Sequence, residues 1–274
     1  MTTEQKLVEA IGIPIEIKQV SIGKHMINYA KAGSGPPLLL IHGANFGWGV
    51  WYPNIAEFAK HFTVYAIDLP GAGRSSRIDY RYINFEEDFV DTAYAWIQKL
   101  GLQNIAIMGH SIGGWVAARI AAQNPGNFKK IILCDSVGFS QPVGGEKFLG
   151  FFPLALALSA TVFRTKKGLD QFFRSAFYHR DIPVLDEFIS YFYETMQRSP
   201  GLLLMSRIIH YRKKLILEKD LSTLTIKTYI IWGEHDKILS APPLHAHLMA
   251  NAGHVPFIEQ RDAFNTLVIN FLTS

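Results

Sequence analysis

The chain has 274 residues, of which 49% are hydrophobic and 18% are charged, and its formal net charge at pH 7 is +4. A chain of this length and apolar content can bury a full core, and its charged fraction is too low for a disordered or highly charged tail protein. The mild net charge and the short, separate basic runs argue against a broad basic surface, so we expect no nucleic-acid partner. Cys134 is the only cysteine, which excludes a disulfide within the chain, and we interpret it as a small buried hydrophobe.

The amino-terminal residues 1–10 are polar and carry Glu4, Lys6 and Glu9, which a secretory signal peptide would not. The longest apolar stretch, residues 151–163, contains a proline and is too short to cross a bilayer. We therefore expect a cytoplasmic protein without a membrane span.

Short apolar runs alternate with helical patterns over much of the chain. Residues 85–100 predict a helix, because Asn84 can cap its first turn, Glu87 stands three residues later and Gly101 can end it. Residues 115–123 are rich in alanine and precede an Asn-Pro pair, which predicts another helix. This alternation is typical of an α/β fold with a mostly parallel sheet flanked by helices. The predicted strands are residues 37–41, 62–67, 104–108, 130–134 and 228–233.

The alternation stops after Val137. Between residues 138 and 220 the sequence shows helical apolar spacing and no convincing strand. We therefore predict an α/β core formed by residues 1–137 and 221–274, with an inserted helical cap formed by residues 138–220. Apolar residues that recur there at three- and four-residue steps are Phe172, Phe173, Phe177, Phe188, Ile189 and Phe192.

Residues 109–113 read Gly-His-Ser-Ile-Gly and lie between a predicted strand and a predicted helix. At such a turn the hydroxyl of the serine, here Ser111, is exposed above the sheet edge on a strained backbone. Side chains in place of the glycines would collide with the neighbouring strand or helix. The amides that open the helix point at the same place and can stabilise an oxyanion. The context therefore predicts that Ser111 is a nucleophile.

A serine nucleophile needs a histidine to accept its proton and a carboxylate to orient that histidine. Downstream of Ser111 the chain offers Asp236, in the loop after the predicted strand 228–233, and then His254, in a glycine turn before the last helix. This order of serine, acid and histidine is the one that accompanies a strand-turn-helix serine. Asp135, which follows another predicted strand, is an alternative acid, and the Gly-Glu-x-Asp context favours Asp236.

Other histidines have simpler interpretations. His245 and His247 alternate on a predicted strand near His235, but no third ligand stands at a suitable spacing, so we expect no metal site. His110 lies beside the nucleophile, and we expect its side chain to point away from the hydroxyl and to pack or hydrogen-bond locally.

With these motifs the chain resembles the α/β-hydrolase superfamily, in particular its capped esterases and carbon–carbon bond hydrolases. The resemblance also rests on His42, Gly43 and Ala44 after one strand and on residues 68–75, Asp-Leu-Pro-Gly-Ala-Gly-Arg-Ser, after the next. It covers residues 14–140 and 220–272 and implies the α/β-hydrolase fold.

The resemblance implies a role for each matching residue. Ser111 matches the nucleophile, His254 the general base and Asp236 the acid that orients it. The backbone amides of Ala44 and Ile112 match the oxyanion hole.

One interval departs from the family pattern. Asp236 and His254 are too close in sequence for the usual crossover helix and further strand. Pro242 and Pro243 would also break a helix early. We predict that the helix is missing or reduced to a turn, and that residues 244–249 form a short last strand.

The cap aromatics, together with Phe46, Trp48 and Trp51 after the oxyanion loop, predict an apolar substrate pocket. The leading hypothesis is a serine hydrolase that cleaves carboxylic esters of small to medium, apolar, uncharged substrates through an acyl-enzyme, with no cofactor. One alternative is a carbon–carbon bond hydrolase of ring-fission diketones, which is less favoured because Val255 follows His254 where those enzymes commonly carry tryptophan. The other is a non-catalytic ligand receptor on the same scaffold. The sequence leaves a homodimer open.

Overall fold

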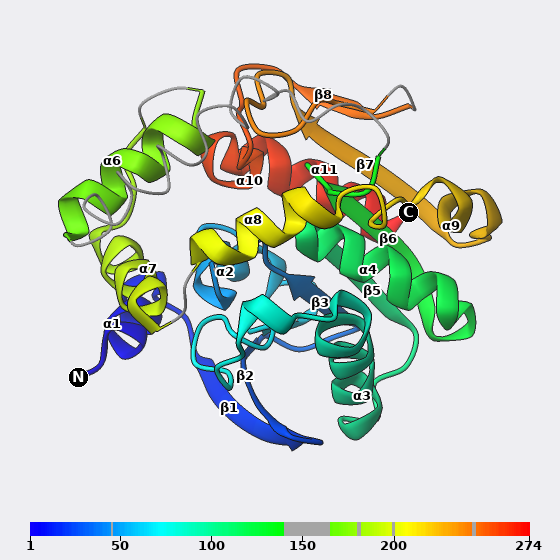
Figure 1. The fold of residues 1–274 in the computed structure, drawn as a ribbon, viewed down its shortest axis with the longest axis horizontal. Coiled ribbons are helices and arrows are strands. Elements are labelled where there is room, and N and C mark those ends of the chain that lie inside the picture. Colours follow the sequence, from blue (N-terminus) through cyan, green and yellow to red (C-terminus); the bar gives the residue numbers. More distant parts are fainter. Residues whose placement is uncertain (45, 140–164, 180–181, 199–200, 243–244) are drawn as a thin grey trace.

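The computed structural model describes residues 1–44, 46–139, 165–179, 182–198, 201–242 and 245–274. These residues form an eight-stranded sheet (Figure 1). Its strands are β1 (Ile15–Ile22), β2 (His25–Ala32), β3 (Pro37–Ile41), β4 (Thr63–Ile67), β5 (Ile105–His110), β6 (Phe128–Cys134), β7 (Lys227–Gly233) and β8 (His247–Met249). Their order across the sheet is β1-β2-β4-β3-β5-β6-β7-β8. The pairs β1–β2 and β2–β4 are antiparallel, and all the others are parallel.

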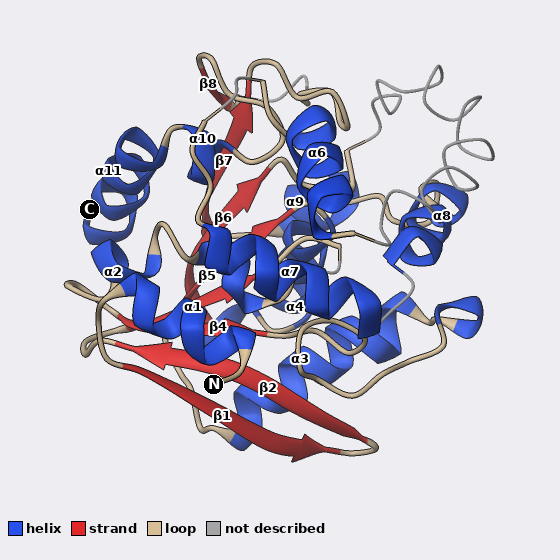
Figure 2. Ribbon diagram, turned by 90° about the vertical axis from the view of Figure 1, so that its left-hand side faces the viewer, coloured by secondary structure: helices blue, strands red, loops and turns tan. Residues whose placement is uncertain are grey.

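Helices lie on both sides of the sheet (Figure 2). The described α-helices are α1 (Thr3–Ile11), α2 (Ile55–Phe58), α3 (Thr92–Lys99), α4 (Ile112–Gln123), α6 (Lys166–Phe177), α7 (Asp186–Arg198), α8 (Gly201–Tyr211), α9 (Glu218–Thr223), α10 (Pro256–Glu259) and α11 (Arg261–Thr273). The remaining helical segments are η1 (Trp48–Trp51), η2 (Tyr80–Tyr82), η3 (Phe85–Asp91) and η4 (Pro125–Asn127). None of the helices in the described part of the chain is both long and apolar enough to cross a membrane.

The core has two layers because the side chains of the central strand β3 alternate between the faces of the sheet. Leu38 and Leu40 belong to a buried cluster that includes residues of α2 and α11. Leu39 and Ile41 belong to a second cluster that includes residues of α3 and α4. A parallel sheet covered on both faces is the expected arrangement for alternating strands and helices. The predicted fold class, a mostly parallel sheet flanked by helices, is therefore confirmed.

The helix predicted over residues 85–100 is present as η3 followed by α3, and its cap differs in one detail. The Asn84 Oδ1 atom accepts hydrogen bonds from the amides of Glu86 and Glu87, at 3.2 and 3.5 Å. The carboxylate that accepts a hydrogen bond from the Asn84 amide, at 2.9 Å, belongs to Asp88 and not to Glu87. Because η3 is wound as a wider π-helix, the side chain that reaches back stands four residues after the cap.

Helices α6, α7, α8 and α9 all lie between β6 and β7 in the chain. Part of the predicted cap, residues 140–164, lies outside the described residues, and so does the apolar stretch 151–163. The aromatic residues of α6 and α7 pack together, with the Phe173 ring centroid 5.7 Å from that of Phe188 and 5.6 Å from that of Phe46. These helices therefore cover the loop that follows β3.

The segment between β7 and the last helices is as short as the sequence indicates. Strand β8 pairs in parallel with β7, from Ile231 with His247 to Gly233 with Met249. The described residues between the two strands form no helix. Strand β8 is shorter than the predicted strand 244–249, and Leu244 lies outside the described residues. The chain therefore returns to the sheet through a loop.

Candidate active site

The Gly-x-Ser-x-Gly motif forms the sharp turn between β5 and α4. Ser111 has φ 54° and ψ −122°, a strained conformation for a residue with a side chain. A Cβ added at Gly109 would lie 2.1 Å from the Gly113 carbonyl oxygen, and one added at Gly113 would lie 2.4 Å from the His42 carbonyl oxygen. Both glycines are therefore needed for the close packing that holds Ser111 at the sheet edge.

His254 and Asp236 meet at the same edge of the sheet. The His254 Nδ1 atom lies 2.8 Å from the Asp236 Oδ2 atom, and the two side chains are 2% and 1% exposed. The Asp236 Oδ1 atom accepts hydrogen bonds from the amides of Ile238 and Leu239, at 2.7 and 3.1 Å. Because the ionised Asp236 is an acceptor, the Nδ1 atom carries the proton and the Nε2 atom of the neutral ring is left as a proton acceptor. The short β7–β8 interval thus brings these two residues together.

The loop that carries His254 is held by hydrogen bonds to other segments of the chain. The His254 amide donates a hydrogen bond to the Phe177 carbonyl oxygen, at the end of α6, at 2.8 Å. The Glu259 carboxylate accepts hydrogen bonds from the Gly253 amide at 2.5 Å and from the His179 amide at 2.7 Å. Sequence reasoning missed Glu259, because only the fold shows that it reaches back to the glycine turn.

The His110 side chain bonds to a residue that is distant in the sequence, which the sequence did not predict. Its Nε2 atom donates a hydrogen bond to the His254 carbonyl oxygen at 2.7 Å, so the expectation of a local partner was wrong. The His110 ring centroid lies 4.7 Å from that of His254 and 5.9 Å from that of Phe46. Burial lowers the pKa of His110 well below its ordinary value, and the ring is neutral. His110 therefore links the turn that carries Ser111 to the loop that carries His254.

Asp135, the alternative acid, is the immediate neighbour of Asp236. One ligand atom from each of Asp135, Asp236 and His254 lies within 4.8 Å of the other two. Asp135 is fully buried and accepts a hydrogen bond from the Gly233 amide at 2.9 Å. Burial and the nearby Asp236 carboxylate raise the pKa of Asp135 well above its ordinary value. Two buried carboxylates this close do not both ionise, so the negative charge lies on Asp236, which binds the histidine.

The same three residues are the cluster among the described residues whose ligand atoms lie close enough for a metal ion. Their polar atoms already bond to one another and to backbone amides, which favours a hydrogen-bonded set over a metal centre. The histidines considered from sequence, His235, His245 and His247, are not members of this cluster. His247 is exposed on β8, and the His235 ring stacks on His179 at 3.8 Å.

Ala44 and Ile112 place backbone amides beside Ser111. Ile112 is the first residue of α4, where a helix has no acceptor for its own amide and the helix dipole favours a negative charge. Ala44 lines the same pocket as Ser111. Neither amide donates a hydrogen bond to any described residue. Both donors are therefore available to an oxyanion.

His42 braces the loop that carries Ala44. Its Nδ1 atom donates to the Gly43 carbonyl oxygen at 2.5 Å, and its Nε2 atom accepts a hydrogen bond from the Leu69 amide at 3.1 Å. Burial lowers the pKa of His42 to about 4, so the ring is neutral and can serve as an acceptor. The loops after β3 and β4 are joined through this one side chain.

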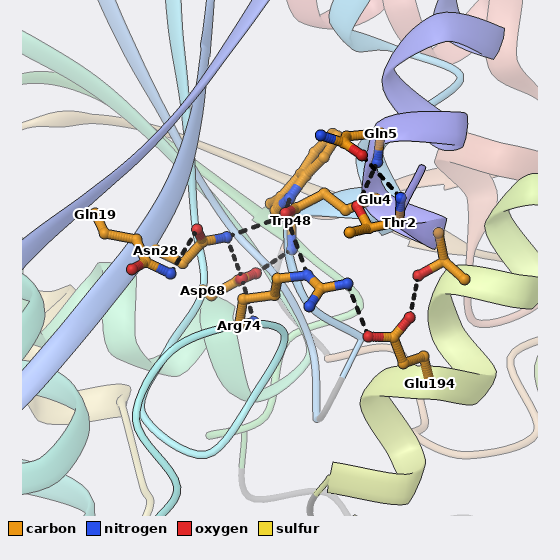
Figure 3. Close-up of polar contacts among 10 residues, drawn as sticks. Thr2, Glu4, Gln5, Gln19, Asn28, Trp48, Asp68, Arg74 and Glu194 are labelled. Atoms are coloured by element: carbon orange, nitrogen blue, oxygen red, sulfur yellow. Dashed lines mark hydrogen bonds and ion pairs between the residues drawn. The ribbon is translucent and has the colours of Figure 1, made fainter.

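A buried carboxylate, Asp68, holds the next part of that loop (Figure 3). It accepts hydrogen bonds from the Trp48 amide at 2.6 Å, from the Asn28 side chain at 2.8 Å and from the Arg74 amide at 2.9 Å. Burial raises the pKa of Asp68 to about 7 in spite of these donors. Asp68 therefore ties the residues after Ala44 to β2 and to the turn after β4.

A second carboxylate, Glu4, extends this network from α1 to α7 (Figure 3). It accepts a hydrogen bond from the Trp48 indole at 2.7 Å and pairs with Arg74 at 3.2 Å. Arg74 also pairs with Glu194 of α7 at 2.7 Å. Helix α7 is thus joined to the amino-terminal helix α1 and, through Glu4, to Trp48 in the segment after β3.

Ser111 and His254 line one pocket with a volume of about 280 Å³. Phe46 lines it, in the place that the sequence indicated for it. Trp48 and Trp51 do not line the pocket and are fully buried in the core. The Trp51 ring packs 4.5 Å from Phe257, and Trp48 is turned toward Glu4, because η1 directs both rings away from the nucleophile.

Three cationic side chains that sequence reasoning did not single out also line the pocket. They are Arg212, Lys213 and Lys237. The sequence shows the first two only as part of a short basic run, and no periodic signal distinguishes a pocket cation from a solvated one.

The chain is similar to known proteins in both sequence and fold. Residues 36–259 match the family described as the alpha/beta hydrolase fold. A 1-acylglycerol-3-phosphate O-acyltransferase of Arabidopsis thaliana is 30% identical over 163 residues, which are 51% of this chain and 39% of that protein. The match therefore spans less than half of the length of that relative.

Two solved structures are similar over nearly the whole chain. Naproxen esterase (carboxylesterase NP) from Bacillus subtilis has a TM-score of 0.78 and 20% identity, and the match covers 98% of this chain and 95% of that one. The 2-hydroxy-6-oxo-6-phenylhexa-2,4-dienoate hydrolase of Rhodococcus sp. strain RHA1 has a TM-score of 0.78 and 20% identity, with coverage of 96% and 100%. At these identities the likeness shows the fold alone. Since the family match covers most of the sequence, the chain belongs to the α/β-hydrolase fold family.

Proposed function

We propose that the protein is a serine hydrolase that cleaves carboxylic esters of small to medium substrates with an apolar body. The observation that carries the proposal is the 2.8 Å bond between His254 and Asp236, made beside a strained Ser111 in one pocket. A strained serine, an oriented imidazole and two available amides are the parts that acyl transfer requires.

In the proposed reaction the Ser111 Oγ atom attacks the ester carbonyl while its proton passes to the His254 Nε2 atom. The amides of Ala44 and Ile112 hold the oxyanion, and Asp236 stabilises the imidazolium. His254 then protonates the leaving alcohol, and water, deprotonated by His254, releases the acid and restores Ser111. No hydrogen bond joins Ser111 to His254 among the described residues, and such bonds commonly tighten only when substrate binds.

The inserted helices serve as a cap in this proposal, with residues 138–220 covering a core of residues 1–137 and 221–274. Phe177 of α6 and Ile208 of α8 line the pocket together with Ser111. A cover of this kind limits the access of bulk water to the reacting groups and binds the apolar part of the substrate.

The test is the turnover of p-nitrophenyl butyrate by the wild-type protein and by the Ser111→Ala variant. We expect the variant to lose about 10⁴-fold or more in kcat, because no other group replaces the nucleophile. Ser206→Ala is the matched control, since Ser206 lies on α8 next to the pocket-lining Met205 but does not itself line the pocket. Equal activity of Ser111→Ala and the control would contradict the proposal.

A second set of substrates separates ester cleavage from the carbon–carbon alternative. Ring-fission dienoates are offered to the wild-type protein beside p-nitrophenyl esters of increasing chain length. Turnover of the dienoates alone would replace the ester proposal, and binding of either class without turnover would favour a receptor.

A further inference from the structure

The pocket that contains Ser111 carries an unbalanced positive charge. Among its described lining residues, Arg212, Lys213 and Lys237 are cationic and none is acidic. These cations come from two separate parts of the chain, the residues just after α8 and the loop after β7. Two separate segments therefore contribute residues of the same charge to the lining of one pocket.

The three cations have no acidic partner among the described residues. The Arg212 guanidinium donates a hydrogen bond to the Ile209 carbonyl oxygen at 3.0 Å, and the Lys237 ammonium donates to the Tyr178 carbonyl oxygen at 3.2 Å. None of the ion pairs formed by the described residues includes Arg212, Lys213 or Lys237. Neutral carbonyl oxygens orient these groups without cancelling their charge.

Two other arginines of this protein are each paired with two acids, whereas Arg207, like Arg212, donates to carbonyl oxygens. Arg74 lies between Glu4 and Glu194, and Arg119 pairs with Glu86 and Asp220. The contrast shows that the pocket cations are not part of a structural ion-pair network. Their charge is available to a ligand.

The rest of the pocket wall is mainly apolar. Its apolar side chains include Phe46, Val137, Phe177, Ile208, Ile216 and Leu239. A ligand that complements both parts of the wall has an apolar body and an anionic group.

We propose that the substrate is an amphiphilic ester that carries an anionic carboxylate or phosphate group, bound by Arg212, Lys213 and Lys237. This inference rests on the proposed ester hydrolysis and replaces the sequence-based expectation of an uncharged substrate. The planar Arg212 fork suits a two-oxygen contact with either anion, and the two lysines add charge without fixing its geometry.

The kinetic test uses two substrates that differ by one charge. They are p-nitrophenyl hydrogen adipate, which ends in a carboxylate, and p-nitrophenyl methyl adipate, in which the same end is a neutral methyl ester. The readout is the ratio of kcat/KM for the anionic ester to kcat/KM for the neutral ester. We expect the wild-type protein to prefer the anion, and the preference to weaken as sodium chloride is raised.

The variants Arg212→Gln, Lys213→Gln and Lys237→Gln are tested singly and together. We expect each single variant to lower the ratio by about two- to fivefold and the triple variant by about tenfold or more. Lys214→Gln is the matched control: it removes the same charge from the residue next to Lys213, but Lys214 does not line the pocket and its ammonium lies 5.5 Å from the Tyr211 ring. The control should keep the wild-type ratio.

A binding experiment tests the proposed anion-binding site independently of ester hydrolysis. Octanoate, octyl phosphate and octan-1-ol are titrated calorimetrically into the Ser111→Ala protein, which needs no turnover. We expect both anions to bind more tightly than the alcohol, and the tighter of the two identifies the anionic group. Adding the three glutamine substitutions should weaken the binding of that anion about tenfold.

The outcomes are distinguishable. Hydrolysis of the neutral ester with a ratio near one, or a ratio that the triple variant leaves unchanged, overturns the inference and leaves the ester hydrolase standing. Tight anion binding without hydrolysis of either ester overturns the proposed function and supports the anionic subsite. Equal binding of octanoate, octyl phosphate and octan-1-ol overturns the subsite.

Discussion

The two walls of the pocket are built differently. On one side, Ser111 and His254 lie in turns next to sheet strands, and both are buried. The buried side chain of Asp236, which does not line the pocket, bonds to His254. Arg212 and Lys213 follow a helix of the insertion and are exposed. In our proposals the chemistry is therefore placed at the edge of the sheet, whereas the ligand charge is read by two residues of the inserted part and by Lys237 of the loop after β7. A sheet of this kind can retain its chemistry while the insertion changes the substrate.

The walls are nevertheless connected. The Phe177 carbonyl oxygen, at the end of α6, accepts a hydrogen bond from the His254 amide, and Glu194 of α7 pairs with Arg74 beside the oxyanion loop. A movement of the inserted helices would therefore shift the loops that carry His254 and Trp48.

The largest effect is expected at the sheet wall, from Asp236→Asn. In this variant the amide oxygen keeps the hydrogen bonds from the Ile238 and Leu239 amides, so the amide NH2 group faces the His254 Nδ1 atom. A donor at that place favours the wrong imidazole tautomer, and we expect kcat for p-nitrophenyl butyrate to fall by about 10⁴-fold. The neighbouring Asp135→Asn should cost less than about tenfold, because an amide resembles a neutral carboxylic acid and can still accept the Gly233 hydrogen bond.

Steady-state kinetics of the two asparagine variants checks this ranking. Circular dichroism confirms that both are folded. If Asp135→Asn lost more activity than Asp236→Asn, the assignment of the charge to Asp236 would be wrong.

A smaller effect, on the free energy of unfolding, is expected at low pH through the buried side chain of His42. Its folded pKa of about 4 lies below the ordinary value of 6.5, so the stability that it contributes is present above pH 6.5 and is lost as the pH falls through 4. Between pH 7 and pH 4 the loss is about 3 kcal/mol. Urea unfolding of the wild-type protein and of His42→Gln measures it as a difference in free energy, in which contributions from other groups cancel.

The wild-type protein should lose its advantage over His42→Gln across that range. A histidine titration followed by NMR, with a midpoint near 4 for His42, provides an independent reading. Parallel loss of stability in both proteins would show that His42 does not titrate as proposed.

Much of the sheet and of the turn that carries Ser111 could be predicted from sequence, because the patterns that indicate them are local. Strands such as β3 and β6 are short apolar runs, and Gly-x-Ser-x-Gly between a strand and a helix requires a particular turn. Asp236 and His254, which the structure brings within 2.8 Å, could be proposed as a pair because chain order and loop position favour them once the turn is known. The lack of a helix among the described residues between β7 and β8 could be predicted from the short interval before His254 and from the two prolines.

The remaining features depend on contacts between distant parts of the chain. Trp48 and Trp51 read as pocket residues, but η1 turns their rings into the core against α7 and α10. Glu4 reads as a polar terminal residue, yet α1 carries it into a buried network with Arg74. Neither outcome has a local signal, because each depends on which helix packs against which loop.

The pocket cations were missed for the same reason. In the sequence, Arg212 and Lys213 form a basic run that is ordinarily a solvated face. Only the fold shows that Lys237, from a different loop, faces the same pocket, and that the described wall holds no acid.

The most direct test of the central claim is covalent labelling by a fluorophosphonate, followed by mass spectrometry of the labelled peptide. Because an activated serine attacks the phosphorus atom and an ordinary one does not, we predict stoichiometric labelling at Ser111 that is lost in Ser111→Ala and strongly slowed in Asp236→Asn. A folded wild-type protein that remains unlabelled at Ser111 would contradict the account.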